Sequence, residues 1–240
     1  MPPGFPELIV ELELASTPTV AALHGTALGG GLETALGAHY RVALASARFG
    51  LPEVHLGILP GAGGTQRLPR VVPIAKAVEM ITGGAMIGAA EALELGLIDE
   101  IALGDDIRAA GIAMATRLVT EGKGVRPTSV RPANQMSSEE FEGLRAVVTK
   151  KARGLLAPLH CMKAIEAAMT LPFEQGQLRE QELFMELLTH PQSRAMIHAF
   201  FADREVAKIP ELKTGTPRDI AKMGVVGGGT MGAGIATSAL

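Results

Sequence analysis

The fold is set by the stretch Thr19-Val20-Ala21-Ala22-Leu23-His24-Gly25 together with Ala27-Leu28-Gly29-Gly30-Gly31-Leu32-Glu33 just after it. Residues 19–23 form a short apolar run of the kind that becomes a buried strand. Three glycines then precede a run of helical composition, and residues 40–45 are again strand-like. The order of strand, glycine turn, helix and strand predicts an α/β fold with a mostly parallel sheet.

Outside residues 19–45 we expect further helices and short strands, and beyond residue 132 mainly helices. Residues 48–70 are dense in Gly and Pro, so we expect mostly loop and short turns there, a kind of segment that is more often functional than not. After Pro127 and Pro132 the periodicity is helical throughout. Helices are expected at 7–15, 73–82, 88–96, 105–121, 138–153, 156–169, 173–189 and 191–203, and further strands at 99–102 and 223–226.

The composition excludes several classes of function. With 47% hydrophobic and 20% charged residues the chain is expected to be globular. A net charge of -3, 7 Phe, 1 Tyr and no Trp argue against a nucleic-acid surface, which needs a basic stripe and stacking rings. No apolar run reaches the roughly 18 residues of a membrane-spanning helix, so we expect no membrane insertion. The single cysteine, Cys161, indicates a reducing compartment. A bacterial cytoplasm is expected, with the peroxisome or the mitochondrial matrix as alternatives.

The glycine run at 29–31 has two interpretations. Glycines before a helix let a ligand approach the backbone and leave the N–H groups of the first helical turn without acceptors. Such donors, helped by the helix dipole, suit a developing negative charge. Alternatively, the glycines only permit close packing, and Glu33 only favours the helix N-terminus by its charge. The run is not a dinucleotide fingerprint because residue 34 is Thr, and it lacks the Lys of a phosphate loop.

A second carboxylate follows in Phe49-Gly50-Leu51-Pro52-Glu53. Because Glu53 is flanked by apolar, loop-forming residues, it is either a solvated loop residue or a desolvated acid with a raised pKa. Two carboxyl groups in different surroundings, one protonated and one ionised, can divide acid and base work between them. Glu33 and Glu53 are therefore candidates for such a pair.

Residues 18–69 as a whole resemble the enoyl-CoA hydratase, or crotonase, family. The resemblance rests on the segments quoted above and on Gly57-Ile58-Leu59-Pro60-Gly61-Ala62-Gly63-Gly64-Thr65-Gln66-Arg67-Leu68-Pro69. So long and ordered a match is specific. It implies a crotonase-like fold, a spiral of strand-strand-helix units, that acts on a CoA thioester without a metal.

The resemblance also implies roles for individual residues. Glu33 would orient and deprotonate the water that attacks C3 of an enoyl-CoA, and Glu53 would give a proton to C2. The N–H of Gly30 would hold the thioester oxygen, an interaction whose removal typically costs about 2.7–4 kcal/mol. The substrate is expected to contact Gly29, Gly30, Leu51, Pro52, Pro60 and Gly61. An enoyl-CoA isomerase that shifts a double bond, and a catalytically inactive scaffold of the same fold, remain as alternatives.

A second resemblance lies near the C-terminal end. Val225-Val226-Gly227-Gly228-Gly229-Thr230-Met231-Gly232 matches G-x-G-x-x-G between a strand-like and a helix-like run, the context of a dinucleotide-binding turn. A crotonase segment, then helices, then such a turn resembles the multifunctional β-oxidation enzymes, in which a hydratase/isomerase module is fused to an NAD-dependent 3-hydroxyacyl-CoA dehydrogenase. This resemblance implies that NAD is bound by Gly227, Gly229, Thr230, Met231 and Gly232. It also implies that the whole protein self-associates or binds a thiolase partner.

The chain departs from this family at both ends. Only seventeen residues precede Pro18, and only eight follow Gly232, whereas a dinucleotide fold needs more strands and an acidic residue about 20 positions past the glycines. We expect a partial crotonase-like domain at 1–121, a helical region completing that module at 122–203, a linker at 204–221 and the first strand, turn and helix of a Rossmann domain at 222–240. We also expect the chain alone to have little hydratase activity and no useful NAD affinity.

The remaining polar candidates have plainer interpretations. The histidines at 24, 39, 55 and 190 show no metal-ligand spacing with Cys161 or with nearby carboxylates, so we expect packing or surface roles. Cys161 is expected to be a core thiol on a helix. Ser137, before a cluster of glutamates, is expected to start a helix.

Overall fold

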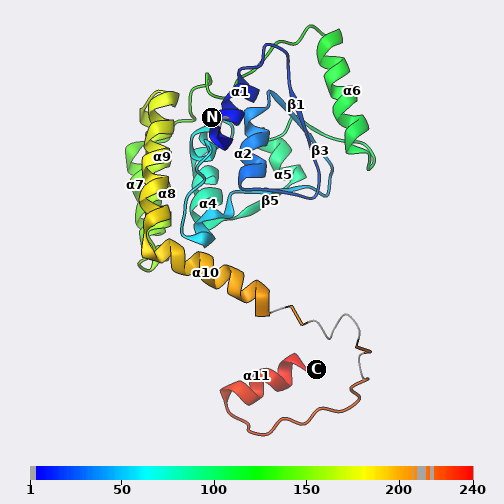
Figure 1. The fold of residues 1–240 in the computed structure, drawn as a ribbon, viewed down its shortest axis with the longest axis vertical. Coiled ribbons are helices and arrows are strands. Elements are labelled where there is room, and N and C mark those ends of the chain that lie inside the picture. The colour runs from blue at the N-terminus through cyan, green and yellow to red at the C-terminus, as the bar shows by residue number, and fades with distance from the viewer. Residues whose placement is uncertain (1–3, 207, 210–214, 217–218, 240) are drawn as a thin grey trace. The chain divides into compact units, whose positions relative to one another are not determined.

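The computed structural model describes residues 4–206, 208–209, 215–216 and 219–239. The chain forms two compact units, residues 1–200 and 201–240. In the first unit, short strands alternate with helices before the chain continues in helices alone (Figure 1). Its helical elements are α1 (Phe5–Glu13), α2 (Gly30–Gly37), η1 (Pro52–Leu56), α3 (Gly64–Arg67), η2 (Leu68–Arg70), α4 (Ile74–Gly83), α5 (Ala89–Glu94), α6 (Ile107–Thr120), α7 (Ser138–Ala152), α8 (Ala157–Thr170), α9 (Phe173–Thr189) and α10 (Pro191–Val206), which runs on into the second unit.

The strands are short and form two sheets. They are β1 (Val20–Leu23), β2 (Thr26–Leu28), β3 (Tyr40–Ala43), β4 (Arg48–Gly50), β5 (Met86–Gly88) and β6 (Glu100–Ile101). In the first sheet β3 pairs in parallel with both β1 and β6. In the second, β4 is parallel to β2 and antiparallel to β5. The predicted α/β class with a mostly parallel sheet is confirmed, with β5 as the antiparallel strand.

A glycine with positive φ precedes the start of helix α2, and hydrogen bonds from a buried arginine mark its end. It begins after Gly29, whose φ of 55° lies in a region that side chains rarely adopt. At its other end the buried Arg41 guanidinium donates to the carbonyls of Ala35 at 3.3 Å and Ala38 at 2.8 Å. The same side chain donates to the carbonyl of Leu97 at 2.6 Å, so it ties the end of α2 to the segment after α5. These bonds satisfy carbonyls that a helix end leaves unpaired.

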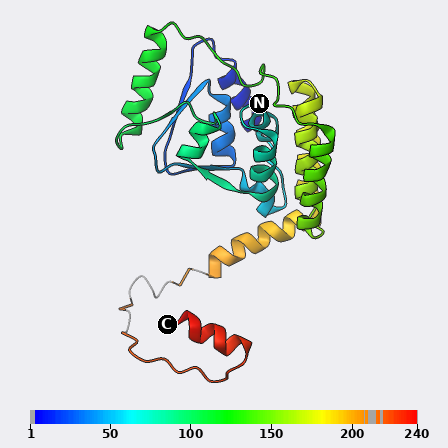
Figure 2. The same ribbon diagram turned by 180° about the vertical axis from the view of Figure 1, so that it is seen from behind.

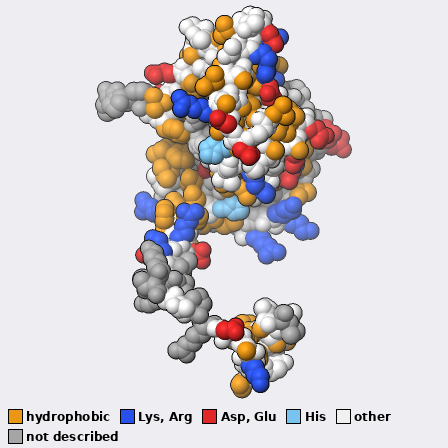
Figure 3. Space-filling model, turned by 90° about the vertical axis from the view of Figure 1, so that its right-hand side faces the viewer, with side chains coloured by type: hydrophobic (Ala, Val, Ile, Leu, Met, Phe, Trp, Pro, Cys, Tyr) orange, Lys and Arg blue, Asp and Glu red, His pale blue; other side chains and the backbone are white. Residues whose placement is uncertain are grey.

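The core lies between the second sheet and the helices α2, α4 and α8. Its largest cluster includes Leu32, Phe49, Ile81, Ile165 and Leu183. Helices α7, α8 and α9 lie side by side, and α8 packs against α4 (Figures 1 and 2). A smaller cluster joins the first sheet to α6. On one face of the molecule, hydrophobic, acidic and basic side chains are interspersed (Figure 3).

Most predicted helices are confirmed, with small shifts of their ends. Ser137 caps α7 in a capping box, because its hydroxyl accepts the N–H of Glu140 at 3.2 Å while the Glu140 carboxylate accepts the N–H of Ser137 at 3.1 Å. Strands β2 and β5 were not expected, and β4 lies in a stretch expected to be loop. Among the described helices, none is long and apolar enough to cross a membrane.

The second unit differs more from the expectation. Residues 223–226, expected to form a strand, are described but have no regular structure. A strand needs a neighbour to receive its hydrogen bonds, and none is found among the described residues of this unit. Helix α11 (Thr230–Ser238) does form where the helix-like run was expected. Of the expected linker at 204–221, α10 includes the first three residues, and 207, 210–214 and 217–218 lie outside the described residues, as do 1–3 and 240.

Candidate active site

Glu33 lies in the first turn of α2 and is 3% exposed. Its Oε1 accepts two backbone hydrogen bonds, from the N–H of Ala62 at 2.8 Å and from the N–H of Gly64 at 2.8 Å. Burial raises the pKa of Glu33 above its ordinary value, while these two N–H donors and the Arg67 charge oppose the rise. The carboxyl is thus held by one oxygen, and its ionised form is the one that the donors favour.

Glu53 lies in the first turn of η1 and is surrounded differently. Its Oε2 is buried and has no hydrogen-bond partner among the described residues. Burial raises the pKa of Glu53 to about 7, and the charge of Glu33 adds to the rise. An acid with a buried, unpartnered oxygen that faces a second negative charge favours its protonated form. The structure therefore brings the two predicted carboxyl groups into electrostatic contact, and burial raises the pKa of both, but only at Glu33 do N–H donors from another segment oppose the rise.

The glycine turn lies against Glu53. The N–H of Gly29 donates to the carbonyl of Gly50 at 3.0 Å, so it is already used. Gly30 is the first residue of α2, and its N–H has no acceptor within the helix. A Cβ placed on Gly29 would lie 2.8 Å from Oε1 of Glu53, and one on Gly30 would lie 3.0 Å from the Phe5 ring. At Gly29 and Gly30 the Glu53 carboxyl and the Phe5 ring fill the space that a side chain would need, whereas Gly31 has open space around it.

The other residues predicted to contact substrate lie near the two acids but differ in exposure. Pro52 directly precedes Glu53, and the side chain of Pro60 lies 2.9 Å from a Cβ placed on Gly64. Gly61 faces the Phe184 ring of α9, which a Cβ on this glycine would meet at 2.6 Å. Leu51 is fully buried in the core. Contact of these residues with substrate stays a prediction.

Glu180 on α9 is a functional candidate that sequence reasoning missed. It is fully buried, and its carboxyl accepts the N–H of Gly63 at 2.7 Å and the N–H of Thr65 at 3.0 Å. Burial raises the pKa of Glu180 to about 8, and the charge of Glu33 adds to the rise. A signal was present in the sequence, because Glu180 shares the buried stripe of α9 with Gly176, Leu183 and Leu187. An acid on an apolar helix face needs hydrogen-bond partners from elsewhere.

A buried ion pair joins α1 to the same region. Arg67 and Glu13 meet at 2.7 Å, and both side chains are almost fully buried. The second Glu13 oxygen accepts the N–H of Ser129 at 2.7 Å. The Arg67 guanidinium also lies over the Phe173 ring, 5.0 Å from its centre. Because removing one partner of such a pair leaves an uncompensated charge, both residues are expected to be structurally important.

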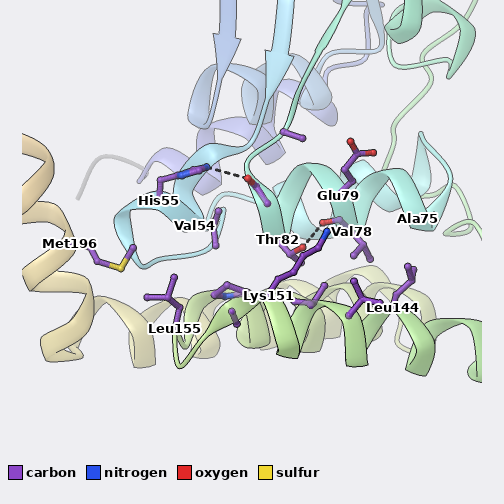
Figure 4. Close-up of a pocket in the computed structure, with 16 residues that line it drawn as sticks. Val54, His55, Ala75, Val78, Glu79, Thr82, Leu144, Lys151, Leu155 and Met196 are labelled. Atoms are coloured by element: carbon purple, nitrogen blue, oxygen red, sulfur yellow. Dashed lines mark hydrogen bonds between the residues drawn. The ribbon is translucent and has the colours of Figure 1, made fainter. Parts of the chain in front are cut away.

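A cavity of about 500 Å³ lies beyond Glu53, between η1 and the helices α4 and α7 (Figure 4). Val54 and His55 form part of its wall, and Lys151 reaches across it from α7. His55 Nε2 lies 3.2 Å from the carbonyl of Gly83, and the hydroxyl of Thr82 donates to the carbonyl of Val78 at 2.8 Å. Neither Glu33 nor Glu53 lines this cavity. It is therefore separate from the carboxyl pair.

Cys161 is the buried core thiol of α8 that the sequence predicted. Burial raises its pKa well above the ordinary value, so the thiolate is strongly disfavoured. Within the described part of the chain, no group of three or more His, Cys, Asp or Glu residues is arranged to hold a metal ion.

The second glycine turn opens α11 in the other unit. Gly227 has a φ of 102°, and Gly229 is the N-cap of the helix. A Cβ placed on Gly232 would run into the carbonyl of Gly227, so the first and last glycines of the motif approach closely. No residue described between 219 and 239 is buried. The helix expected after the turn is present, the strand expected before it is not, and the turn is exposed.

Comparisons with known proteins agree with the fold and with the first motif. A family model described as enoyl-CoA hydratase/isomerase matches residues 3–126. A peroxisomal bifunctional enzyme of Danio rerio is 43% identical over 249 residues, which cover 99% of this chain and 34% of that protein. A peroxisomal fatty acid beta-oxidation multifunctional protein of Oryza sativa is 39% identical over 250 residues, 100% of this chain and 34% of that protein.

Solved structures of enoyl-CoA hydratase-like proteins have a fold similar to that of this chain. Carnitinyl-CoA hydratase from Mycobacterium avium is 31% identical with a TM-score of 0.54, and the match covers 78% of this chain and 60% of that one. The chain spans about a third of the length of the curated relatives named above.

Proposed function

Because the chain belongs to the enoyl-CoA hydratase/isomerase family, we propose that its carboxyl pair hydrates 2-trans-enoyl-CoA thioesters to 3-hydroxyacyl-CoA. The observation that carries the proposal is the different treatment of two neighbouring acids. Glu33 is held by two N–H donors, whereas a Glu53 oxygen is buried without a partner. One carboxyl is thereby suited to accept a proton and the other to give one.

The reaction follows from this division. Glu33 takes a proton from a water molecule as its oxygen bonds to C3, and the π electrons of the double bond move onto the thioester oxygen. The N–H of Gly30, free of a helix acceptor, stabilises that oxygen as charge develops on it. Glu53 then gives its proton to C2, so that the elements of water are added across the double bond. Exchange of one proton with solvent restores the pair.

The test is hydration of a short 2-trans-enoyl-CoA by a protein that contains this chain, followed by the loss of ultraviolet absorbance of the conjugated thioester. We expect Glu33→Gln to lower the rate steeply, and the exposed Glu182→Gln to leave it unchanged. Equal rates for the wild type and Glu33→Gln would refute the proposed role of Glu33.

An enoyl-CoA isomerase is the second candidate, and the Glu53 carboxyl favours it in one respect. A group with a pKa of about 7 can take up a proton as readily as it gives one, which a double-bond shift at C2 requires. Isomerisation needs no activated water, so Glu33→Gln should spare it while hydration falls. Parallel assays with 2-enoyl-CoA and 3-enoyl-CoA substrates separate the two activities.

An inactive scaffold is the alternative from another class. The presence of both acids and of the glycine run argues against it. Isothermal titration of the chain with an acyl-CoA distinguishes the cases, because a scaffold should release no heat of binding.

We further propose that residues 222–240 begin an NAD-binding domain of a 3-hydroxyacyl-CoA dehydrogenase. The positive φ of Gly227 and the start of α11 at Thr230 support this, since a helix N-terminus after a glycine turn suits a pyrophosphate. Gly227, Gly229, Thr230, Met231 and Gly232 would lie against the cofactor. NAD would accept the hydride from the hydroxyl-bearing carbon. The test is a raised KM for NAD after Gly227→Val in a protein that contains the chain.

The setting of the whole protein is likewise a proposal. Self-association and a thiolase partner follow from the resemblance, and size-exclusion chromatography with light scattering tests the first. For the compartment, the bacterial cytoplasm expected from the sequence stands beside the peroxisome that the relatives' names give.

A further inference from the structure

The segment 62–65 is held from two sides by two different carboxyl groups. Its four successive N–H groups alternate in direction. Those of Ala62 and Gly64 donate to Oε1 of Glu33, each at 2.8 Å. Those of Gly63 and Thr65 donate to Glu180, at 2.7 Å to Oε1 and at 3.0 Å to Oε2. Because the directions alternate, moving one pair of N–H groups must move the other.

The conformation that produces this alternation is unusual. Gly63 has a φ of 95°, in the left-handed region, and directly precedes α3. Successive N–H groups around such a residue form a concave surface that binds anions. Here the two faces of the segment receive one carboxyl each, from α2 and from α9, more than 100 residues apart in the sequence.

Glu180 is the firmer of the two anchors. It uses both oxygens, and its Oε2 also accepts the hydroxyl of Thr65 at 2.5 Å. Thr65 is in turn held by Gln66, whose Nε2 donates to the threonine hydroxyl at 2.9 Å and to the carbonyl of Ala164 at 2.9 Å. Glu180 is fully buried on α9, a helix of 17 residues that packs on α8. The segment is thereby fastened to the helical layer.

Glu33 is held more lightly. Only Oε1 takes part in the hydrogen bonds found among the described residues, which leaves Oε2 for another partner. A base that must orient a water molecule needs one oxygen fixed and the other free. The orientation of Glu33 therefore depends on where the Ala62 and Gly64 N–H groups point.

We propose that Glu180 is a positioning residue, which fixes segment 62–65 so that the Ala62 and Gly64 N–H groups hold Glu33 in its working orientation. The proposal rests on the proposed function for its catalytic meaning, but its structural content is independent of activity. The carboxyl groups of Glu33 and Glu180 lie on opposite faces of the segment, and the Arg67 charge helps to lower the pKa of Glu33. The segment separates the two acids and links their positions.

Amide hydrogen exchange measured by NMR on this chain tests the proposal without an enzymatic assay. In Glu180→Gln the protection of the Ala62 and Gly64 amides, which do not touch residue 180, should fall roughly tenfold, because weaker hydrogen bonds from Gly63 and Thr65 to residue 180 loosen the whole segment. The amides of α8 should keep their protection. Glu182→Gln, an exposed change on the same helix, should match the wild type. Retained protection of Ala62 and Gly64 would overturn the proposal.

Two further variants test whether Glu33 depends on Glu180 for its position or Glu180 depends on Glu33. In Glu33→Gln the Gly63 and Thr65 amides should stay protected, because Glu180 still holds them, and loss of their protection would reverse the proposed order of dependence. Thr65→Val removes the hydroxyl bonds of residue 65 to Glu180 and from Gln66 but keeps its N–H bond to Glu180, so it serves if Glu180→Gln fails to fold. It should lower protection at Ala62 and Gly64 by a smaller factor, and wild-type protection there would count against the proposal.

In a protein that hydrates enoyl-CoA, Glu180→Gln should lower kcat and leave KM for the thioester unchanged, since residue 180 is fully buried and is not among the residues expected to contact substrate. A change in KM alone would contradict the positioning role. An inactive wild-type protein would refute the proposed function. The amide hydrogen-exchange measurements would still decide whether Glu180 positions segment 62–65.

Discussion

The two glycine turns that the sequence motifs single out, at residues 29–31 and 227–229, both precede helices, and only the first lies among buried acids. Gly29 precedes α2 and faces the Glu53 carboxyl, whereas Gly227 and Gly229 precede α11 in a stretch with no buried residue described. Both turns have a glycine with positive φ and a helix directly after it. The comparison shows that a glycine turn orients backbone N–H groups, whereas the side chains packed against the turn determine which reaction could occur there.

The largest expected effect comes from the acids that distinguish the first turn. Glu33→Gln and Glu53→Gln should each lower hydration of a 2-trans-enoyl-CoA by about 10²–10⁴-fold, the usual contribution of one general acid or base. Steady-state kinetics on a protein that contains the chain measure this. The exposed Glu139→Gln serves as the control. A similar loss in the control would show that the effect does not depend on the pair, and the contrast between the two turns would disappear.

The buried acids should also make stability depend on pH, which the exposed turn cannot do. Glu53 has an ordinary pKa of 4.5 and a pKa of about 7 in the fold, so the folded state binds its proton more tightly than the unfolded state does. Its contribution to stability is complete below about 4.5 and is lost as the pH rises through about 7. A folded pKa that lies one pH unit above the unfolded pKa corresponds to about 1.4 kcal/mol.

Denaturant unfolding across this range measures that dependence. Glu180, with a pKa of about 8, should extend the loss to higher pH. Glu53→Gln should reduce the slope of the curve between about 4.5 and 7 without removing it, because Glu180 also has a raised pKa across this interval. A free energy of unfolding that rises over this interval in the wild type would contradict the raised pKa values.

Single alanines sharpen the comparison within the first turn. Gly29→Ala should destabilise the fold by about 1–3 kcal/mol, because the residue has φ of 55° and its new Cβ would lie 2.8 Å from Oε1 of Glu53. Gly31→Ala is the matched control, since nothing lies within 4 Å of a Cβ there. It should be neutral or stabilise α2 by about 0.5–1 kcal/mol. Thermal unfolding of both variants decides whether the close approach to Glu53 is what requires glycine.

The smallest effect is expected in the second turn. Gly228→Ala introduces a Cβ with nothing within 4 Å, at a residue without positive φ. The free energy of unfolding of the Gly228→Ala variant should stay within about 0.5 kcal/mol of the wild-type value. A larger loss would mean that this turn is packed after all, and that the contrast with Gly29 is weaker than the structure indicates.

Local sequence patterns predicted most of the helices but not the shortest strands. Helix α7 could be placed from Ser137 and its periodicity, because a cap and an apolar stripe are local signals. Strands β2 and β5 have three residues each, too few to show alternation. At residues 223–226 an apolar run was expected to be a strand, and this prediction was wrong, because a strand forms only where a neighbour accepts its hydrogen bonds.

The sequence by itself determined the α/β class, the enoyl-CoA hydratase/isomerase family and the choice of Glu33 and Glu53, because ordered motifs at fixed spacing are local information. Only the tertiary structure decided which of the two acids is held by N–H donors and which is left without a partner. It also placed Glu180 against the segment that holds Glu33. The physical reason is that burial and neighbouring charges set the protonation of a carboxyl group, and both come from elements far apart in the chain.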